Sequence, residues 1–140
     1  MTSFLIGALL CLMGGLGAVT RFVLDTAVKQ PWSRIPDNAD ERTTAIHAFP
    51  LSTLVVNIAA SLLAGIVAAA FVYHGDSASP WRLVLATGFL GGFSTFSTAI
   101  NESVTLLRNG KRAVAAANIV LEYVVPLLCV ALGWWLAAAL

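Results

Sequence analysis

Charged residues are scarce in this sequence: Asp, Glu, Lys and Arg together make up 11% of its 140 residues. A soluble domain carries about 25% charged residues and about 45–50% apolar ones, whereas 59% of this chain is hydrophobic. Such a chain lacks the polar surface that a fold in water needs. The composition therefore excludes most enzymes and predicts one domain, residues 1–140, that is folded in lipid.

Cysteine and histidine are scarce as well, with two of each. Cys11 and Cys129 lie in apolar runs, and two isolated thiols specify neither a disulfide framework nor a metal site. His47 and His74 fall in predicted loops, without a convincing nucleophile–base arrangement. The net charge of +1 gives no basic field for nucleic acid. We therefore expect neither an enzyme nor a nucleic-acid partner.

The sequence is rich in long apolar runs. A helix that spans a bilayer needs about 20 mainly apolar residues, and four segments meet that length, at about residues 4–24, 51–73, 81–107 and 113–140. A long polar loop over residues 25–50 and two short polar turns separate them. The sequence thus predicts an all-α membrane protein with four transmembrane helices.

Lysine and arginine are distributed unevenly between the two sides that these segments define. The first and third loops would share one side, with Lys29, Arg34, Arg42, Arg108, Lys111 and Arg112. The other side, with both termini and the second loop, has only Arg82. Because Lys and Arg remain cytoplasmic, we expect both termini to face outward.

Small residues recur at helical spacing inside the first two segments. They form the rows Gly7, Cys11, Gly15; Gly14, Ala18; Ala60, Ala64; and Ser61, Gly65. Such rows let helix backbones approach closely in a membrane. We expect them to serve helix packing.

A polar amide stands in the middle of the second segment. Asn57 follows Thr53 by four residues, so the two share one helix face. An amide in hydrocarbon must find partners or line a wet cavity. Two roles therefore remain open for Asn57. It forms a hydrogen bond that packs two helices, or it lines a polar pathway.

The third segment has a composition that disfavours a continuous helix. A Gly91-Gly92 pair is followed by four hydroxyl residues within five positions. We predict a break between Gly91 and Thr95, which frees backbone carbonyls. Broken helices in transporters present such carbonyls to cations, so a cation site is the favoured reading and a simple kink the alternative.

The remaining polar groups in the spans indicate a small anion. Hydroxyls, an amide and the edges of the Phe93 and Phe96 rings are donors or partly positive groups. Glu102 and Glu122 are intramembrane ionisable residues, which are functional hypotheses by default. Four short helices cannot enclose such a pathway alone, so we expect an oligomer.

Three runs together resemble the small bacterial fluoride channels of the Fluc/CrcB family. They are GGLGAVTRF at residues 14–22, PLSTLVVN at residues 50–57 and GFLGGFSTFSTAINE at residues 88–102. The resemblance covers all four segments in order. It implies a subunit of an antiparallel dimer in the bacterial inner membrane, with two fluoride pores and a central structural sodium ion that is not transported.

The resemblance also implies roles for individual residues. The backbone carbonyls of Gly91 and Ser94 would hold the sodium ion, and Arg21 would lie in the pore vestibule. The fluoride pathway would be lined by Thr53, Asn57, Phe96, Ser97 and Thr98. A further polar track would include Glu102, Asn118 and Glu122.

The sequence departs from the family pattern at three places. Ala99 stands where the second pore phenylalanine is expected, and Asn118 and Glu122 stand where a tyrosine and a serine are expected. A carboxylate in an anion pathway repels its cargo unless it is protonated or paired. The first loop is also longer than usual.

These departures leave three functions in competition. The first is passive export of fluoride, by a homodimer or by a heterodimer with an oppositely oriented paralogue that supplies the missing ring. The second is a four-helix proton-coupled efflux transporter of small molecules. The third is a non-conducting subunit that completes the pore of a partner. The biased loop charges favour one fixed orientation and hence the paralogue.

Overall fold

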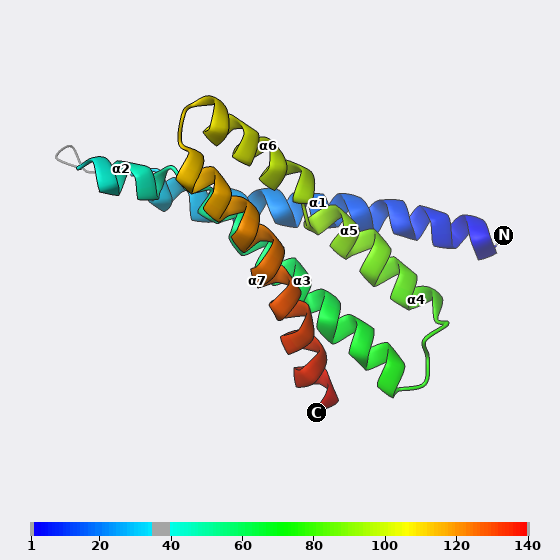
Figure 1. The fold of residues 1–140 in the computed structure, drawn as a ribbon. Coiled ribbons are helices and arrows are strands. Elements are labelled where there is room, and N and C mark those ends of the chain that lie inside the picture. The colour runs from blue at the N-terminus through cyan, green and yellow to red at the C-terminus, as the bar shows by residue number, and fades with distance from the viewer. Residues whose placement is uncertain (1, 35–39, 140) are drawn as a thin grey trace.

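The computed structural model describes residues 2–34 and 40–139, and within these ranges every regular element is a helix. The elements are α1 (Thr2–Trp32), α2 (Glu41–His47), α3 (Leu51–Tyr73), α4 (Pro80–Leu83), the π-helix η1 (Val84–Phe89), α5 (Leu90–Phe93), α6 (Phe96–Arg108) and α7 (Arg112–Ala138). Figure 1 shows α3 and α7 side by side, with α1 crossing behind α5.

Four stretches of helix are long and apolar enough to cross a membrane, which confirms the predicted all-α fold with four transmembrane segments. The second stretch, Leu51–Tyr73, coincides with the predicted one. The third comprises α4, η1, α5 and α6 in succession, over Pro80–Arg108. The fourth, Arg112–Ala138, begins one residue before the predicted segment, and the predicted end at Leu140 lies outside the described residues.

The first helix is longer than the predicted segment, since it continues beyond Leu24 to Trp32. At 1.5 Å per residue its 31 residues span about 46 Å, more than the roughly 30 Å of a hydrocarbon core. Hydropathy marks where lipid ends, but the mixed residues 25–30 (DTAVKQ) are still compatible with helix. The predicted polar loop 25–50 is therefore partly helical.

A second short helix, α2, also occupies that loop. Its N-cap is Asp40, whose Oδ1 accepts a hydrogen bond from the Thr43 amide at 2.8 Å. This hydrogen bonding holds the pKa of Asp40 below its usual value. Trp32 at the end of α1 stacks on His47 at the end of α2, with ring centroids 4.9 Å apart.

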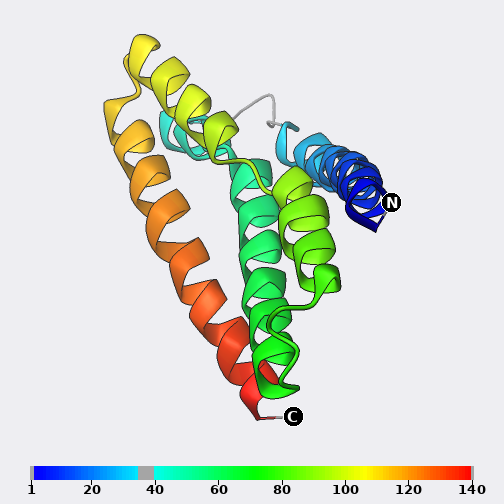
Figure 2. The same cartoon turned by 90° about the vertical axis from the view of Figure 1, so that its right-hand side faces the viewer.

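The helices pack as two glycine-mediated pairs, seen from a second direction in Figure 2. In the pair α3–α7, a Cβ added at Gly65 would overlap the carbonyl oxygen of Val130, and one at Gly133 would overlap that of Leu62. In the pair formed by α1 with η1 and α5, the backbones meet at Gly17 and Gly92. Close backbone approach thus holds both pairs together.

We expect Gly65→Ala to destabilise the chain by about 1–3 kcal/mol, because the new methyl group overpacks the α3–α7 contact. The matched control is Gly7→Ala, since a Cβ added there would meet no described atom within 4 Å beyond the backbone of its own helix. Thermal unfolding in detergent would compare the two variants. Equal stability of both would contradict this account of the packing.

The rows of small residues only partly serve packing inside this chain. Gly14 and Gly65 lie in helix contacts, as expected. By contrast, a Cβ added at Gly7 or Gly15 would meet no described atom within 4 Å beyond the backbone of its own helix, and Cys11 is exposed. The row Gly7, Cys11, Gly15 therefore forms an outer face of α1 and packs against no other described helix of this chain, so its role in helix packing stays a prediction.

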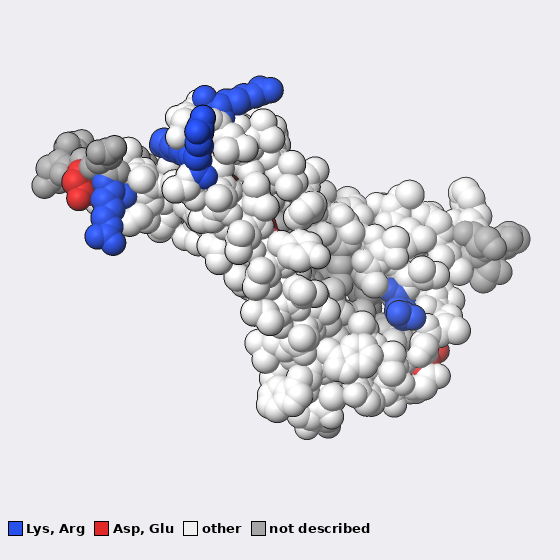
Figure 3. Space-filling view, in the orientation of Figure 1, with Lys and Arg blue, Asp and Glu red and all other residues white. Residues whose placement is uncertain are grey.

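The basic side chains gather at one end of the molecule. Figure 3 shows Lys and Arg concentrated near α2 and the turn between α6 and α7. In Figure 1 the labels N and C stand at the free ends of α1 and α7, away from α2. We call the end with α2 and the α6–α7 turn the basic end. The two basic loops predicted to share one side of the membrane thus lie at the same end of the fold.

Candidate functional site: an interrupted helix clamped by an asparagine

The third transmembrane stretch is interrupted at two residues. Helix α5 ends at Phe93, and Ser94 (φ −76°, ψ 157°) and Thr95 (φ −152°, ψ 92°) are extended before α6 begins at Phe96. Thr95 is the N-cap of α6, with its hydroxyl oxygen accepting from the Thr98 amide at 3.4 Å. The interruption lies at the end of the predicted range of residues 91–95.

Gly91 and Gly92 themselves remain helical, unlike the prediction that took the glycine pair as part of the break. The reason is visible at Gly92, where an added Cβ would overlap the carbonyl oxygen of Gly14. Glycine at position 92 therefore serves the close contact of α5 with α1 rather than the loss of helix.

Asn57 clamps the interruption from α3. Its Oδ1 accepts a hydrogen bond from the Thr95 amide at 2.9 Å, and its Nδ2 donates to the Thr95 carbonyl at 3.2 Å. One amide side chain thus satisfies both polar groups of an extended residue at membrane depth, where unsatisfied backbone groups are costly. The hydrogen bond that packs two helices, one of the two roles open for Asn57, is present.

This clamp changes the bonding of the preceding carbonyls. In a continuous helix the Thr95 amide would bond to the Gly91 carbonyl, and the Thr98 amide to the Ser94 carbonyl. Both amides bond elsewhere, to Asn57 and to the Thr95 hydroxyl. The carbonyls of Gly91 and Ser94 therefore lose their helical partners.

Gly91 and Ser94 line a shallow surface hollow of about 200 Å³. The hollow is bounded on the α3 side by Ser61 and two alanines. Gly91 and Ser94 are both exposed in the single chain. Main-chain oxygens without helical partners are the ligands that broken helices present to cations, and these two belong to exposed residues.

A buried carboxyl group lies against the clamp. Asn57 Nδ2 also donates to Glu122 Oε2 at 2.7 Å, which joins α3, α7 and the interrupted helix. Glu122 is 4% exposed. Its other oxygen, Oε1, is buried and has no hydrogen-bond partner among the described residues.

A second buried network lies one helical turn away on α7. Asn118, which is fully buried, donates to the Ser103 hydroxyl at 2.8 Å and to the Ala99 carbonyl at 3.2 Å. Ser103 also donates to that carbonyl, at 2.9 Å. Ala99 is itself buried, so the position of the missing phenylalanine leaves no room for a ring without rearrangement.

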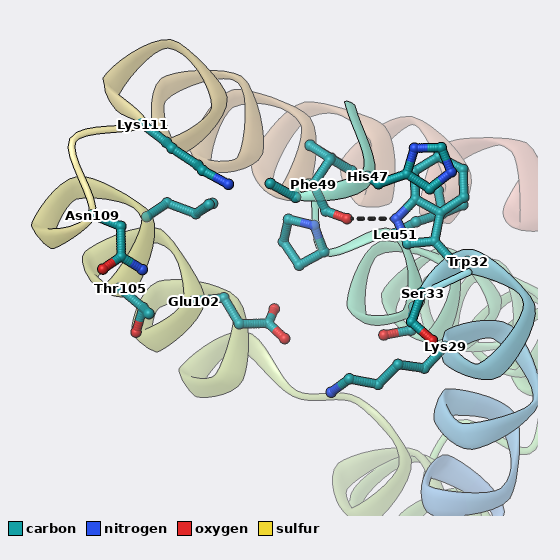
Figure 4. A pocket seen from close by; sticks show the side chains of 14 residues that line it. Lys29, Trp32, Ser33, His47, Phe49, Leu51, Glu102, Thr105, Asn109 and Lys111 are labelled. Carbon is teal, nitrogen blue, oxygen red and sulfur yellow. Dashed lines mark hydrogen bonds between the residues drawn. The ribbon is translucent and has the colours of Figure 1, made fainter. Parts of the chain in front are cut away.

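A cavity of about 380 Å³ opens at the basic end, between α1, α2 and α6. Figure 4 shows the Lys29 ammonium and the Glu102 carboxylate pointing toward one another across it, with Lys111 reaching in from the α6–α7 turn. Trp32 Nε1 donates to the Phe49 carbonyl at 2.9 Å at its rim. The cavity is thus a mouth lined by two cations and one carboxylate.

The predicted site residues fall into two groups. Asn57 and Glu122 share one network, and Thr53 is buried on the same helix as Asn57, near Glu102. Phe96 and Ser97, by contrast, are exposed at the start of α6, and this single chain does not bring them to the clamp. Arg21, half-buried on α1, also lies outside the two buried networks. Thr98, half-buried on α6, does meet the interruption, because its hydroxyl and its amide contact the Thr95 hydroxyl at 2.6 and 3.4 Å.

Sequence reasoning missed four residues of this region. Thr95 carries a recognisable signal, because a hydroxyl residue at the start of a helix is a typical N-cap. The partners Ser103, Lys29 and Lys111 carry no such signal, since each meets its neighbours only through the tertiary fold.

Comparisons with known proteins agree over nearly the whole chain. The family model described as "CrcB-like protein, Camphor Resistance (CrcB)" matches residues 8–134. A Bifidobacterium longum protein named fluoride-specific ion channel FluC 3 is 51% identical over 134 residues, which cover 96% of this chain and 98% of the relative. FluC 1 of the same organism is 44% identical, with 88% of each chain covered.

A more distant relative retains the same coverage. The protein named fluoride-specific ion channel FluC in Pyrococcus horikoshii is 39% identical over 130 residues, which cover 93% of this chain and 94% of the relative. The matched region contains all four membrane-spanning stretches except the extreme ends. This chain belongs to the CrcB family.

Proposed function

We propose that this protein is a subunit of a fluoride-specific ion channel that lowers cytoplasmic fluoride by passive export. The membership in the CrcB family and the names of the relatives support fluoride as the ion. The protein is a channel subunit and not an enzyme. The single observation that carries the proposal within the structure is the Asn57 clamp on the interrupted third span.

The proposed pathway follows the polar side chains of α3, α6 and α7. Small anions are stripped of water only where donors replace that water, and Thr53 presents a hydroxyl group from α3. Asn57 lies on the same helix face and belongs to the pathway by family resemblance, while its two N–H groups hold the Thr95 carbonyl and Glu122 Oε2. Phe96, Ser97 and Thr98 belong to the same pathway by family resemblance. Phe96 and Ser97 are exposed at the surface of the single chain, so they become part of an enclosed pathway only when a second subunit covers them.

Arg21 and the basic mouth would supply the pathway with anions. Arg21 is the vestibule residue of the proposal, and the cavity with Lys29 and Lys111 opens at the basic end. Cations at the mouth raise the local concentration of a permeant anion. The further polar track of the proposal contains Glu102, Asn118 and Glu122.

A structural sodium ion belongs to the proposal as well. The carbonyls of Gly91 and Ser94 would hold it, because both lose their helical partners and both line the open hollow. A bound sodium ion would take the place of the missing hydrogen-bond donors at these oxygens, between two subunits. We propose that the ion is structural and is not transported.

The orientation of the chain follows from its charges. Lys and Arg gather at the basic end, and six of them lie at or just after the end of α1, in α2 and at the α6–α7 turn, whereas Arg82 stands in α4, after the turn that follows α3. We propose that the basic end faces the cytoplasm and that both termini face outward. Pairing with an oppositely oriented paralogue would then give an antiparallel dimer, and Bifidobacterium longum does contain relatives numbered 1 and 3.

Reporter tags on either terminus are expected to report one orientation, with the termini outside. The physical reason is the bias of Lys and Arg toward one set of loops, which fixes insertion. The measurement is a pair of fusion reporters, one active only in the cytoplasm and one active only outside. Equal signals from both reporters would contradict a fixed orientation and favour a homodimer.

Growth of a fluoride-sensitive bacterium that lacks its own fluoride channel tests the function in cells. Expression of this chain, together with its paralogue where one chain is insufficient, is expected to restore growth in fluoride. A matched vector that carries Asn57→Leu should not restore it. Unchanged fluoride sensitivity with both chains present in the membrane would refute the proposed function.

A further inference from the structure

The orientation of the Asn57 amide is fixed by the backbone of Thr95. An N–H group of Thr95 must meet an acceptor and its carbonyl must meet a donor, so Oδ1 faces the former and Nδ2 the latter. The reverse orientation would place donor against donor and acceptor against acceptor.

This orientation determines which oxygen of Glu122 is an acceptor. Nδ2 of Asn57 donates to Oε2 of Glu122 at 2.7 Å, so Oε2 is occupied as an acceptor. Oε1 is buried and has no partner among the described residues. If Glu122 carries a proton, that proton belongs on Oε1, the oxygen free to donate.

Among the described residues, the surroundings of Glu122 provide no cation to pair with it. Helix α3 contains no charged residue between Leu51 and Tyr73. Helix α6 contributes Glu102, a second carboxyl group whose field reaches Glu122. The cations on or beside α2, α6 and α7 are Arg42, Arg108, Lys111 and Arg112, all at the basic end. Lys29 of α1 faces Glu102 across the mouth, and neither it nor Arg21 of α1 contributes to the field at Glu122.

The distance to those cations is large compared with a salt bridge. Arg112 precedes Glu122 by ten residues on α7, a rise of about 15 Å along the helix. An isolated carboxylate in apolar surroundings is so unfavourable that the group holds its proton instead. A neutral Glu122 is therefore the state that fits its burial and its single acceptor contact.

We propose that Glu122 is a specificity-determining residue of the pathway, which holds a proton on Oε1 and donates it in a hydrogen bond to the passing fluoride ion. The inference rests on the proposed function. The proton remains on Glu122 as the anion moves on. In this role Glu122 replaces the hydroxyl donor expected at its position, and its Oε2 keeps Asn57 in the orientation that clamps Thr95.

A strong donor at this point suits fluoride in particular. Hydrogen bonds to an ionised acceptor are about twice as strong as neutral ones, and a carboxylic acid is a stronger donor than an alcohol. An ionised Glu122 would have the opposite effect, because a negative charge beside Asn57 would repel the anion. Conduction should therefore fall in alkaline buffer as Glu122 loses its proton.

Infrared spectroscopy of the reconstituted protein tests the proton directly. The wild type minus Glu122→Gln difference is expected to contain the C=O stretch of a protonated carboxylic acid, and that band should shift when fluoride replaces chloride. The band should persist in Glu102→Gln, the matched intramembrane control. A difference spectrum with carboxylate bands at neutral pH, or a band that ignores fluoride, would overturn the inference.

Fluoride efflux from liposomes at neutral and alkaline pH separates the inference from the proposed function. Wild-type efflux is expected to fall at least about tenfold in alkaline buffer, whereas the Glu122→Gln variant, with an amide donor that does not ionise, keeps a flat pH profile. Identical profiles for both proteins would refute the role of Glu122. Absence of wild-type efflux, with and without the paralogue, would instead refute the proposed function.

Discussion

Replacing Asn57 by leucine is expected to lower the rate of fluoride efflux by at least about a hundredfold. The variant removes the side chain that bonds to both polar groups of Thr95 and to Oε2 of Glu122. Each buried group left without a partner costs about 1–3 kcal/mol. Three such groups together exceed what the interrupted helix can tolerate without rearrangement.

The expected loss comes from geometry as much as from stability. A tenfold change in an equilibrium constant corresponds to about 1.4 kcal/mol, so the lost bonds are sufficient for a hundredfold effect. Without the clamp, the Thr95 amide is free to return to the Gly91 carbonyl, which closes the interruption. The carbonyl oxygens of the cation site and the start of α6 would move together.

Asn101→Leu is the matched control for this prediction. Asn101 lies on the exposed face of α6, and its contact among the described residues is a backbone carbonyl that accepts from Thr105. The comparison should include protein yield and an elution profile for each variant. Efflux through Asn57→Leu at the rate of the control would show that the clamp is not needed for conduction.

Removal of sodium is the second change with a large expected effect. In liposomes prepared with a bulky organic cation in place of sodium, fluoride efflux is expected to fall at least about tenfold. The carbonyls of Gly91 and Ser94 would then face the partner subunit without a ligand, and each unsatisfied buried oxygen costs about 1–3 kcal/mol. Titration with sodium at constant ionic strength should restore the rate.

The serine side chain provides a sharp control for that experiment. Because the proposed ligand is the main-chain carbonyl, Ser94→Ala is expected to keep the sodium midpoint of the wild type. Potassium added at the same ionic strength should not substitute for sodium. Efflux that ignores sodium over the whole titration would contradict a structural cation at Gly91 and Ser94.

Much of the fold could be predicted from the local composition of the sequence. Four apolar runs predict four transmembrane helices, and the cluster of glycine and hydroxyl residues lies where helix α5 gives way to two extended residues. These features depend on a few neighbouring residues, which a sequence displays directly. The continuation of α1 to Trp32 was missed because hydropathy measures exposure to lipid and not helix length.

The contacts of the candidate site could not be predicted from neighbouring residues in the sequence. Asn57 is 38 residues from Thr95 and 65 residues from Glu122 in the sequence, so their meeting depends on how α3, α7 and the third span pack. The same is true of Asn118 with Ser103. Residue type alone indicated that Asn57 and Glu122 needed partners, and the fold supplied the partners' identity.

The most direct test of the central claim is fluoride release from liposomes that contain the purified chain, alone and together with the proposed paralogue of opposite orientation. We predict that fluoride leaves in at least one of these two preparations once a potassium ionophore compensates its charge, that chloride stays inside, and that no pH gradient is required. Release of chloride as fast as fluoride, dependence on a proton gradient, or no fluoride release from either preparation would contradict the account.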